Sequence, residues 1–171
     1  MKTIKTIIAC VALISITARA QQTAFQDSLL DKLAGKWILQ GTIAGQETTH
    51  DISVEWVLNH EYLQIHEVSR EKNAQGTPAY EAIVYIGWNQ QTSQYQCLWL
   101  DVTGGGGLNG DAIGHAKQNG DEIPFLFISP DGSSFHTTFA YGLDTDTWKW
   151  IMDAEAGGKT QPFARLTLKK N

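Results

Sequence analysis

The stretch LAGKWILQG, residues 33–41, joins the end of a predicted helix to the first of many predicted strands. Before it, large apolar residues recur at spacings of four, one and three, which places them on one stripe of an amphipathic helix over about 23–33. Gly35 is a natural stop just past the end of such a helix. Because a helix of about three turns is marginal in isolation, its stripe must dock on another element. We expect it to close one end of the structure that begins at Lys36.

Alternation replaces helical spacing from Lys36 onward. In the run 50–58, larger side chains alternate with Asp51, Ser53 and Glu55, a period of two that is typical of a half-buried strand. Turn residues such as Asn119-Gly120 separate this run from others of the same kind. The further strands are predicted at about 62–70, 80–88, 94–101, 108–117, 123–128, 134–141, 148–153 and 163–168.

This pattern predicts the fold class. About 8–10 short strands joined by tight turns, with no helical pattern between them, are typical of a sandwich or of an up-and-down barrel. Sequential hairpins without a long crossing connection favour the barrel, because closure removes exposed sheet edges. We therefore expect an all-β, up-and-down antiparallel β-barrel with a short N-terminal helix, with strands over about 36–168.

Several motifs along the chain carry a family resemblance. They are Gly35-x-Trp37, Gly41, 54–58, 61–63, 79–82, 86–89 and 95–101. Together they resemble the DUF1579-type lipocalin-like family and, more distantly, lipocalins and nitrobindin-like barrels. The resemblance implies a calycin-like barrel whose closed end is covered by Trp37, and it implies no settled biochemical activity. Nitrobindin-like barrels hold haem through a His near the C-terminus, and here no His follows His136.

The N-terminal segment 1–20 has the pattern of a secretory signal. Two lysines precede an apolar run over 7–16, and Ala18-Arg19-Ala20 is a small-x-small cleavage site. We expect cleavage before residue 21 and a secreted or periplasmic domain over 21–171. The apolar run is too short to span a bilayer, and no later segment approaches ~20 apolar residues, so no membrane insertion is expected. Cys10 follows too few residues for a lipoprotein site, and lipidation is not expected.

Charge and cysteine content exclude further classes. The whole chain has 13 Lys and Arg against 18 Asp and Glu, and removal of residues 1–20 takes away three of the bases. This acidic balance, with no basic cluster beyond Lys169-Lys170, argues against nucleic-acid binding. Only Cys97 remains in the mature chain, so no intramolecular disulfide can form, and Cys97 is expected to be a small buried hydrophobe.

Candidate ligand-binding residues follow from the predicted strand faces. His66 shares a face with Tyr62, and a titratable ring among aromatic and polar neighbours can bind an anionic or metal-bearing ligand. Asp101 shares a face with Trp99, and a buried acid needs a partner such as Arg165 to remain charged. Other aromatic residues form either packed core, which we favour, or the lining of an apolar pocket. These are Phe139, Trp148 and Trp150.

The sequence favours a non-catalytic carrier or sensor that binds a small apolar or amphipathic molecule without a metal or cofactor. The five His are scattered without zinc-site spacing, and strands flank the glycine run 104–107 where a dinucleotide motif needs a helix. The first alternative is a calycin-type enzyme, in which Asp101, His66 and Arg165 converge on one cavity. The second is a structural or interaction role for a barrel with a filled core.

Overall fold

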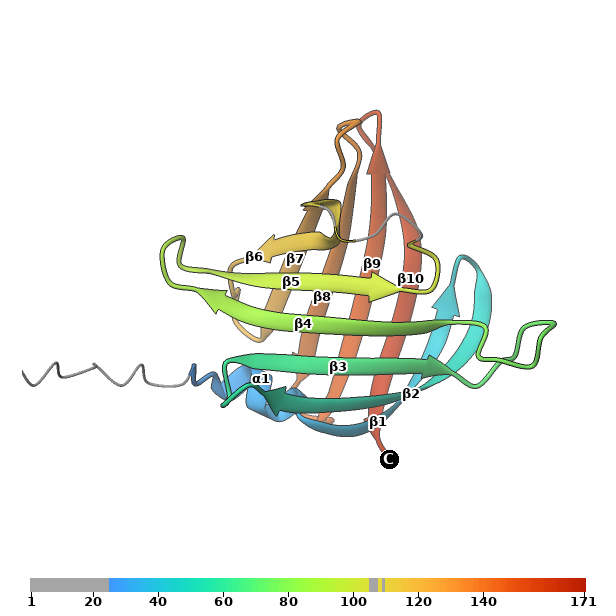
Figure 1. Cartoon of the computed structure of the whole chain (residues 1–171), viewed down its shortest axis with the longest axis horizontal. Coiled ribbons are helices and arrows are strands. Elements are labelled where there is room, and N and C mark those ends of the chain that lie inside the picture. Colours follow the sequence, from blue (N-terminus) through green and yellow to red (C-terminus); the bar gives the residue numbers. More distant parts are fainter. Residues whose placement is uncertain (1–24, 105–107, 109) are drawn as a thin grey trace, which may run out of the picture.

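Ten antiparallel strands close into one barrel in the computed structural model, which describes residues 25–104, 108 and 110–171 (Figure 1). Each strand pairs with the next along the chain, and β1 pairs with β10 to close the sheet. The predicted up-and-down barrel is therefore confirmed, while the predicted signal segment lies outside the described residues. The strands are β1 (Gly35–Ile43), β2 (Gln46–Val57), β3 (Tyr62–Ser69), β4 (Glu81–Asn89), β5 (Gln94–Asp101), β6 (Ile113–Ala116), β7 (Glu122–Ile128), β8 (Ser134–Gly142), β9 (Thr147–Ala156) and β10 (Lys159–Lys170).

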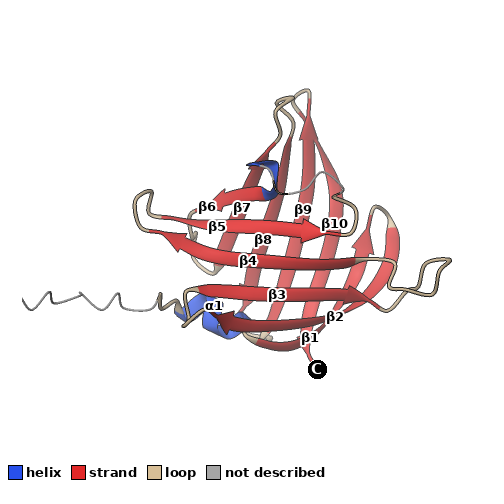
Figure 2. Cartoon of the chain, in the orientation of Figure 1, coloured by secondary structure: helices blue, strands red, loops and turns tan. Residues whose placement is uncertain are grey.

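The N-terminal helix α1 (Ser28–Leu33) is shorter than predicted (Figure 2). Residues 25–27 are not helical, so the predicted start was too early. The reason is a capping residue: Asp27 has extended backbone angles, and its carboxylate accepts hydrogen bonds from the amides of Leu29 and Leu30 at 2.9 Å each. An aspartate in this position satisfies amides that have no partner within the helix, and it thereby sets the first turn.

Helix α1 and Trp37 together close one end of the barrel. The leucines of the helix stripe are buried in the same core cluster as Trp37. Trp37 is 1% exposed, and its indole Nε1 donates to the carbonyl oxygen of Leu33 at 2.7 Å. That bond satisfies a carbonyl at the helix end, where the next turn no longer supplies a donor. Trp37 therefore joins the helix to β1 as well as filling space.

The strand before β7 differs from the prediction. Instead of a strand over 108–117, the chain forms a 3-10 turn, η1 (Gly110–Ala112), followed by β6, which has four residues. At Gly114 of β6 there is no room for a side chain, because a Cβ there would lie 2.6 Å from the ring of Phe127. The phenyl ring of β7 thus lies across the backbone of β6. Cys97 is buried, as predicted.

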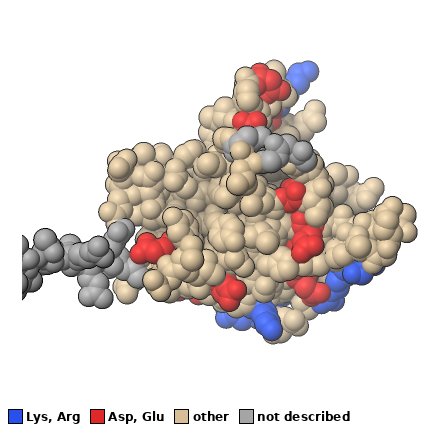
Figure 3. Space-filling model, in the orientation of Figure 1, with Lys and Arg blue, Asp and Glu red and all other residues tan. Residues whose placement is uncertain are grey.

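The interior of the barrel is packed only at the end covered by α1. Trp148, Trp150 and Phe139 are each at most 1% exposed and fill this half together with the leucines of α1. On the face of the molecule shown in Figure 3, Asp and Glu are scattered, while Lys and Arg lie mainly along the lower edge. In the described part of the chain, no helix has the length and apolar character of a membrane span.

Candidate functional site

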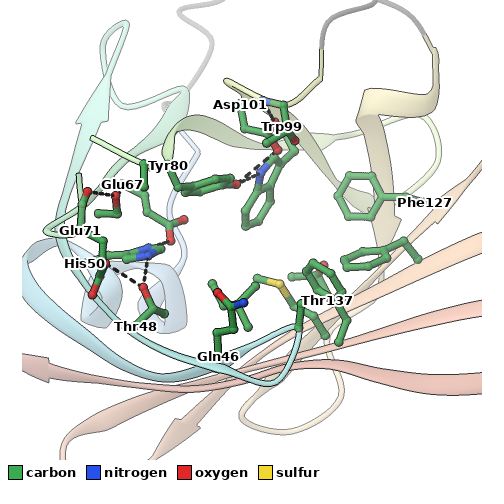
Figure 4. Close-up of a pocket in the computed structure, with 18 of the residues that line it drawn as sticks. Gln46, Thr48, His50, Glu67, Glu71, Tyr80, Trp99, Asp101, Phe127 and Thr137 are labelled. Atoms are coloured by element: carbon green, nitrogen blue, oxygen red, sulfur yellow. Dashed lines mark hydrogen bonds and ion pairs between the residues drawn. The ribbon is translucent and has the colours of Figure 1, made fainter. Parts of the chain in front are cut away.

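A cavity of about 620 Å³ occupies the half of the barrel away from α1 (Figure 4). Its mouth is formed by residues at the hairpin ends opposite the helix, such as Ala44, Thr103 and Ser129. Its floor is formed by Trp99, Thr137 and Met152, which border the packed half. The barrel interior is therefore packed in the half next to α1 and hollow in the opposite half.

One wall of the cavity is apolar. It is built by side chains of one side of the barrel, including Phe127 of β7, Phe135 of β8 and Phe163 of β10. The rings of Phe135 and Phe163 meet edge to face, with centroids 5.2 Å apart. Such a surface contributes to binding by removing apolar ligand atoms from water.

The opposite wall carries a buried His–Glu pair. His50 continues the inward face of Ile52 and Val54 in β2, while Glu67 lies opposite Ile52 in the register of β2 with β3. Both side chains are 2% exposed, and His50 Nδ1 lies 2.5 Å from Glu67 Oε1. Figure 4 shows this pair on one side of the cavity and Phe127 on the other. Burial of two ionisable groups is tolerable here because each supplies a hydrogen-bond partner to the other.

The protons of this pair can be assigned from its neighbour Thr48. The Thr48 hydroxyl contacts His50 Nε2 at 2.7 Å and donates to Glu71 Oε2 at 2.9 Å. Desolvation works to raise the pKa of Glu71, but hydrogen bonds from its own amide, from the Thr49 amide and from Thr48 hold that pKa below its usual value. Glu71 is therefore a carboxylate that takes the single hydroxyl proton. Consequently, His50 Nε2 carries a proton and donates it to Thr48.

The other ring nitrogen then shares one proton with Glu67. Either His50 is an imidazolium facing a carboxylate, or His50 is neutral and the proton is on Glu67 Oε1. The second oxygen, Glu67 Oε2, is buried and has no hydrogen-bond partner within the described protein. In both proton arrangements Oε2 carries no hydrogen, so it is an acceptor that the fold leaves without a donor.

Two aromatic residues extend the polar wall. Trp99 Nε1 donates to the Tyr80 hydroxyl at 3.1 Å, and that hydroxyl donates to Asp101 Oδ2 at 3.3 Å. The Tyr80 ring also stacks on His50, with centroids 5.7 Å apart. Burial and the nearby charge of Glu67 raise the pKa of Tyr80, so the phenol stays neutral. Asp101 Oδ1 accepts from the Thr103 amide at 2.7 Å, which ties the start of the next loop to the cavity mouth.

Hydroxyl, imidazole and carboxylate thus stand in the order of a nucleophilic triad. In this proton arrangement His50 Nε2 already carries a proton, so it does not accept the Thr48 proton as the base of a triad would. Both ring nitrogens are hydrogen-bonded within the protein, Nε2 to Thr48 and Nδ1 to Glu67. The arrangement can present a hydrogen-bond acceptor to a ligand. No cluster of three or more His, Cys, Asp or Glu that could hold a metal is found among the described residues.

Two of the predicted site residues line the cavity, namely Trp99 and Asp101. Three others, Phe139, Trp148 and Trp150, belong to the packed half, in agreement with the interpretation as core. They support the floor of the cavity: Trp99 meets Trp150 edge to face, with centroids 6.2 Å apart.

His66 and Tyr62 lie on the outer face of β3, away from the cavity. His66 Nε2 contacts Glu81 at 2.8 Å with both side chains more than a third exposed, and Tyr62 is 45% exposed. The prediction that the face of His66 and Tyr62 binds the ligand is wrong, because Leu63 and Ile65 take the inward positions. Glu67 follows them in the same phase.

Arg165 also lies away from the cavity and does not pair with Asp101. Its guanidinium donates to Asp153 at 2.6 Å and to the carbonyl of Met152 at 2.8 Å. Asp101 is instead satisfied by Tyr80 and by the loop that follows it. Asp101, His66 and Arg165 therefore do not converge on one cavity, which contradicts the form of the enzyme alternative that depended on them.

The sequence interpretation missed the residues that matter most here, namely Thr48, His50, Glu67, Glu71 and Tyr80. A signal for two of them was present. A histidine in phase with Ile52 and Val54, and a glutamate in phase with Leu63 and Ile65, are polar residues at inward positions of adjacent strands. Only the register between the strands shows that they meet.

The chain has few recognisable relatives among known proteins. No family model matches the chain, and no curated protein matches it. Among solved structures, a redesigned β-barrel is similar, with a TM-score of 0.41 and 11% identity over 87% of this chain and 99% of that chain.

Proposed function

We propose that this protein is a secreted or periplasmic barrel of the carrier or sensor type, which binds a small amphipathic molecule in its open half. The observation that carries the proposal is a cavity of about 620 Å³ with one apolar wall and one polar wall. Ligand sites commonly enclose about 300–1,000 Å³ and combine apolar lining with a few polar groups. The motifs shared with the DUF1579-type family support the same architecture, and we propose membership of it on those motifs.

Binding fits the site better than either alternative. A barrel with a filled core would leave no such cavity. As the base of a triad, His50 Nε2 would have to accept the Thr48 proton, whereas the Thr48 hydroxyl donates that proton to Glu71. The inner wall therefore offers shape, apolar surface and one acceptor, which are the properties of a binding site.

A neutral probe tests whether molecules enter this half of the barrel. Nile red is uncharged and becomes strongly fluorescent in apolar surroundings, so its fluorescence should rise on titration with the protein. Thr137 of β8 is 1% exposed and lines the cavity, while the next residue, Thr138, points to the other face of the same strand. The substitution Thr137→Phe should fill the cavity and abolish the signal, whereas Thr138→Phe should leave it unchanged.

Circular dichroism and thermal unfolding establish that both variants fold. Equal dye binding by the two variants would place the dye outside the barrel and would contradict the proposal. A flat response of the unsubstituted protein to Nile red would do the same.

A further inference from the structure

The acceptor that the fold leaves without a partner specifies the polar end of the ligand. We propose that the ligand is an amphipathic organic cation, whose protonated amine donates to Glu67 Oε2 while its apolar body lies against the phenylalanine wall. This inference rests on the proposed function and adds the chemical class of the molecule.

The ligand must donate a hydrogen bond to Glu67 Oε2. Glu67 is 2% exposed, and its Oε2 lacks a partner within the described protein. Because the proton shared with His50 lies at Oε1, Oε2 remains an acceptor whichever of the two groups holds that proton. A buried acceptor without a donor is destabilising, so a group that brings an N–H to this position gains a hydrogen bond that the empty site lacks. A head group with acceptors only cannot supply it.

The acidic side chains around the cavity favour a cationic donor over a neutral or anionic one. The cavity is lined by carboxylate side chains and by no Lys or Arg in the described part of the chain. These carboxylates are Glu47, Glu67, Glu71, Asp101 and Asp111. Among the described residues of the lining, the single basic side chain is His50, whose nitrogens are both hydrogen-bonded. A carboxylate or phosphate on the ligand would meet like charges in a partly water-excluded space, whereas an ammonium group meets opposite ones.

The aromatic residues of the polar wall also suit a cation. The ring of Tyr80 stacks on His50, beside Glu67, and the indole of Trp99 is hydrogen-bonded to the Tyr80 hydroxyl. An ammonium group at Glu67 would thus share the cavity wall with two aromatic rings, and such rings attract cations through their quadrupoles. Across the cavity, Phe127 offers an apolar surface to the rest of the molecule.

Three probes with the same apolar chain isolate the head group: octylamine, 1-octanol and octanoate. Each is titrated at pH 7 against the protein with Nile red bound, and its affinity is read from loss of dye fluorescence. We expect octylamine to bind about tenfold or more tightly than 1-octanol, because charge-assisted hydrogen bonds are roughly twice as strong as neutral ones. Octanoate should bind more weakly than either.

A matched pair of variants locates the effect. Glu67→Gln replaces the ionisable carboxyl group of the pair by a neutral amide with little change of shape, and it should reduce the affinity for octylamine to about that for 1-octanol. Glu81→Gln makes the same change in the exposed pair between Glu81 and His66 on the outer face, and it should leave all three affinities unchanged. Thermal unfolding shows whether each variant folds, and the comparison of the three probes on the unsubstituted protein needs no variant.

The outcomes separate this inference from the proposed function. Nile red binding without a preference for octylamine over 1-octanol, or with octanoate the tightest, overturns the inference and leaves the carrier function intact. A preference for octylamine that persists in Glu67→Gln also overturns it, because the group that selects the amine then lies elsewhere. Failure of the dye and of all three probes to bind overturns the proposed function itself.

Discussion

Replacement of Trp37 by Phe tests whether the indole holds the helix to the barrel. Trp37 is 1% exposed, and its Nε1 hydrogen bond to the Leu33 carbonyl spans 2.7 Å between buried atoms. Phenylalanine keeps the apolar ring but has no donor and a smaller volume. The variant should therefore leave a buried carbonyl without a partner at the end of α1, and a small void between the helix and the barrel.

The size of the effect follows from these two losses. An unsatisfied buried acceptor costs about 1–3 kcal/mol. Removal of part of a buried side chain adds roughly 0.5–1.5 kcal/mol for a change of about one methylene, and the difference between indole and phenyl is somewhat larger. We expect Trp37→Phe to lower the free energy of unfolding by about 2–4 kcal/mol. For a domain of this size, that corresponds to a fall of roughly 5–15 °C in Tm.

Urea titration and thermal unfolding, both followed by far-ultraviolet circular dichroism, measure the loss. The matched control is Trp88→Phe, because Trp88 is 38% exposed and stacks on Phe25 through its ring, which phenylalanine retains. We expect the control to lose less than about 1 kcal/mol. Equal losses in the two variants would refute the reasoning, since burial and the indole hydrogen bond would then have no special effect.

Three further outcomes are expected. Asp27→Ala should lower the free energy of unfolding by about 1–2 kcal/mol, because the helix loses its N-cap and the Tyr95 hydroxyl loses its carboxylate partner; urea titration against Asp31→Ala as a control measures this, and equal losses would contradict the capping role. Cys97, whose thiol pKa is raised by burial, should not react with Ellman's reagent until the protein unfolds, and rapid native-state reaction would contradict its burial. Burial also raises the pKa of Tyr80 above the value of about 10 expected in the unfolded chain, so its stabilising contribution is complete below pH ~10 and is lost as the pH rises toward the folded-state pKa. A spectrophotometric titration that shows all five tyrosines of the chain ionising near pH 10 without unfolding would contradict this.

Much of the fold could be predicted because its signals are local. A side-chain period of two marks a strand wherever one face is buried, and turn residues mark where each strand ends. The chain from Lys36 onward carries both signals, and the helix stripe that ends at Leu33 carries a period near 3.6. The least accurate prediction was the strand over 108–117. There the ring of Phe127 lies against Gly114, a contact between two strands that the local sequence pattern does not show.

The candidate site could be predicted only in part, because alternation defines two faces without saying which one is inward. In β3 one face holds Tyr62 and His66, and the other holds Leu63, Ile65 and Glu67. A shift of one residue exchanges the two faces. The aromatic and titratable residues of the first face led to the prediction that this face binds the ligand, and that prediction was wrong. The inward phase placed Glu67 in the barrel and His66 on its surface.

The sequence by itself determined the architecture: LAGKWILQG joins a helix to a strand, and alternation with frequent turns carries the chain through an all-β meander. The tertiary structure alone decided which half of the interior is packed and which is hollow. It also brought His50 to Glu67 and left Oε2 of that glutamate without a donor. The physical reason is that these features depend on strand register and barrel closure, which join residues that are distant in the chain.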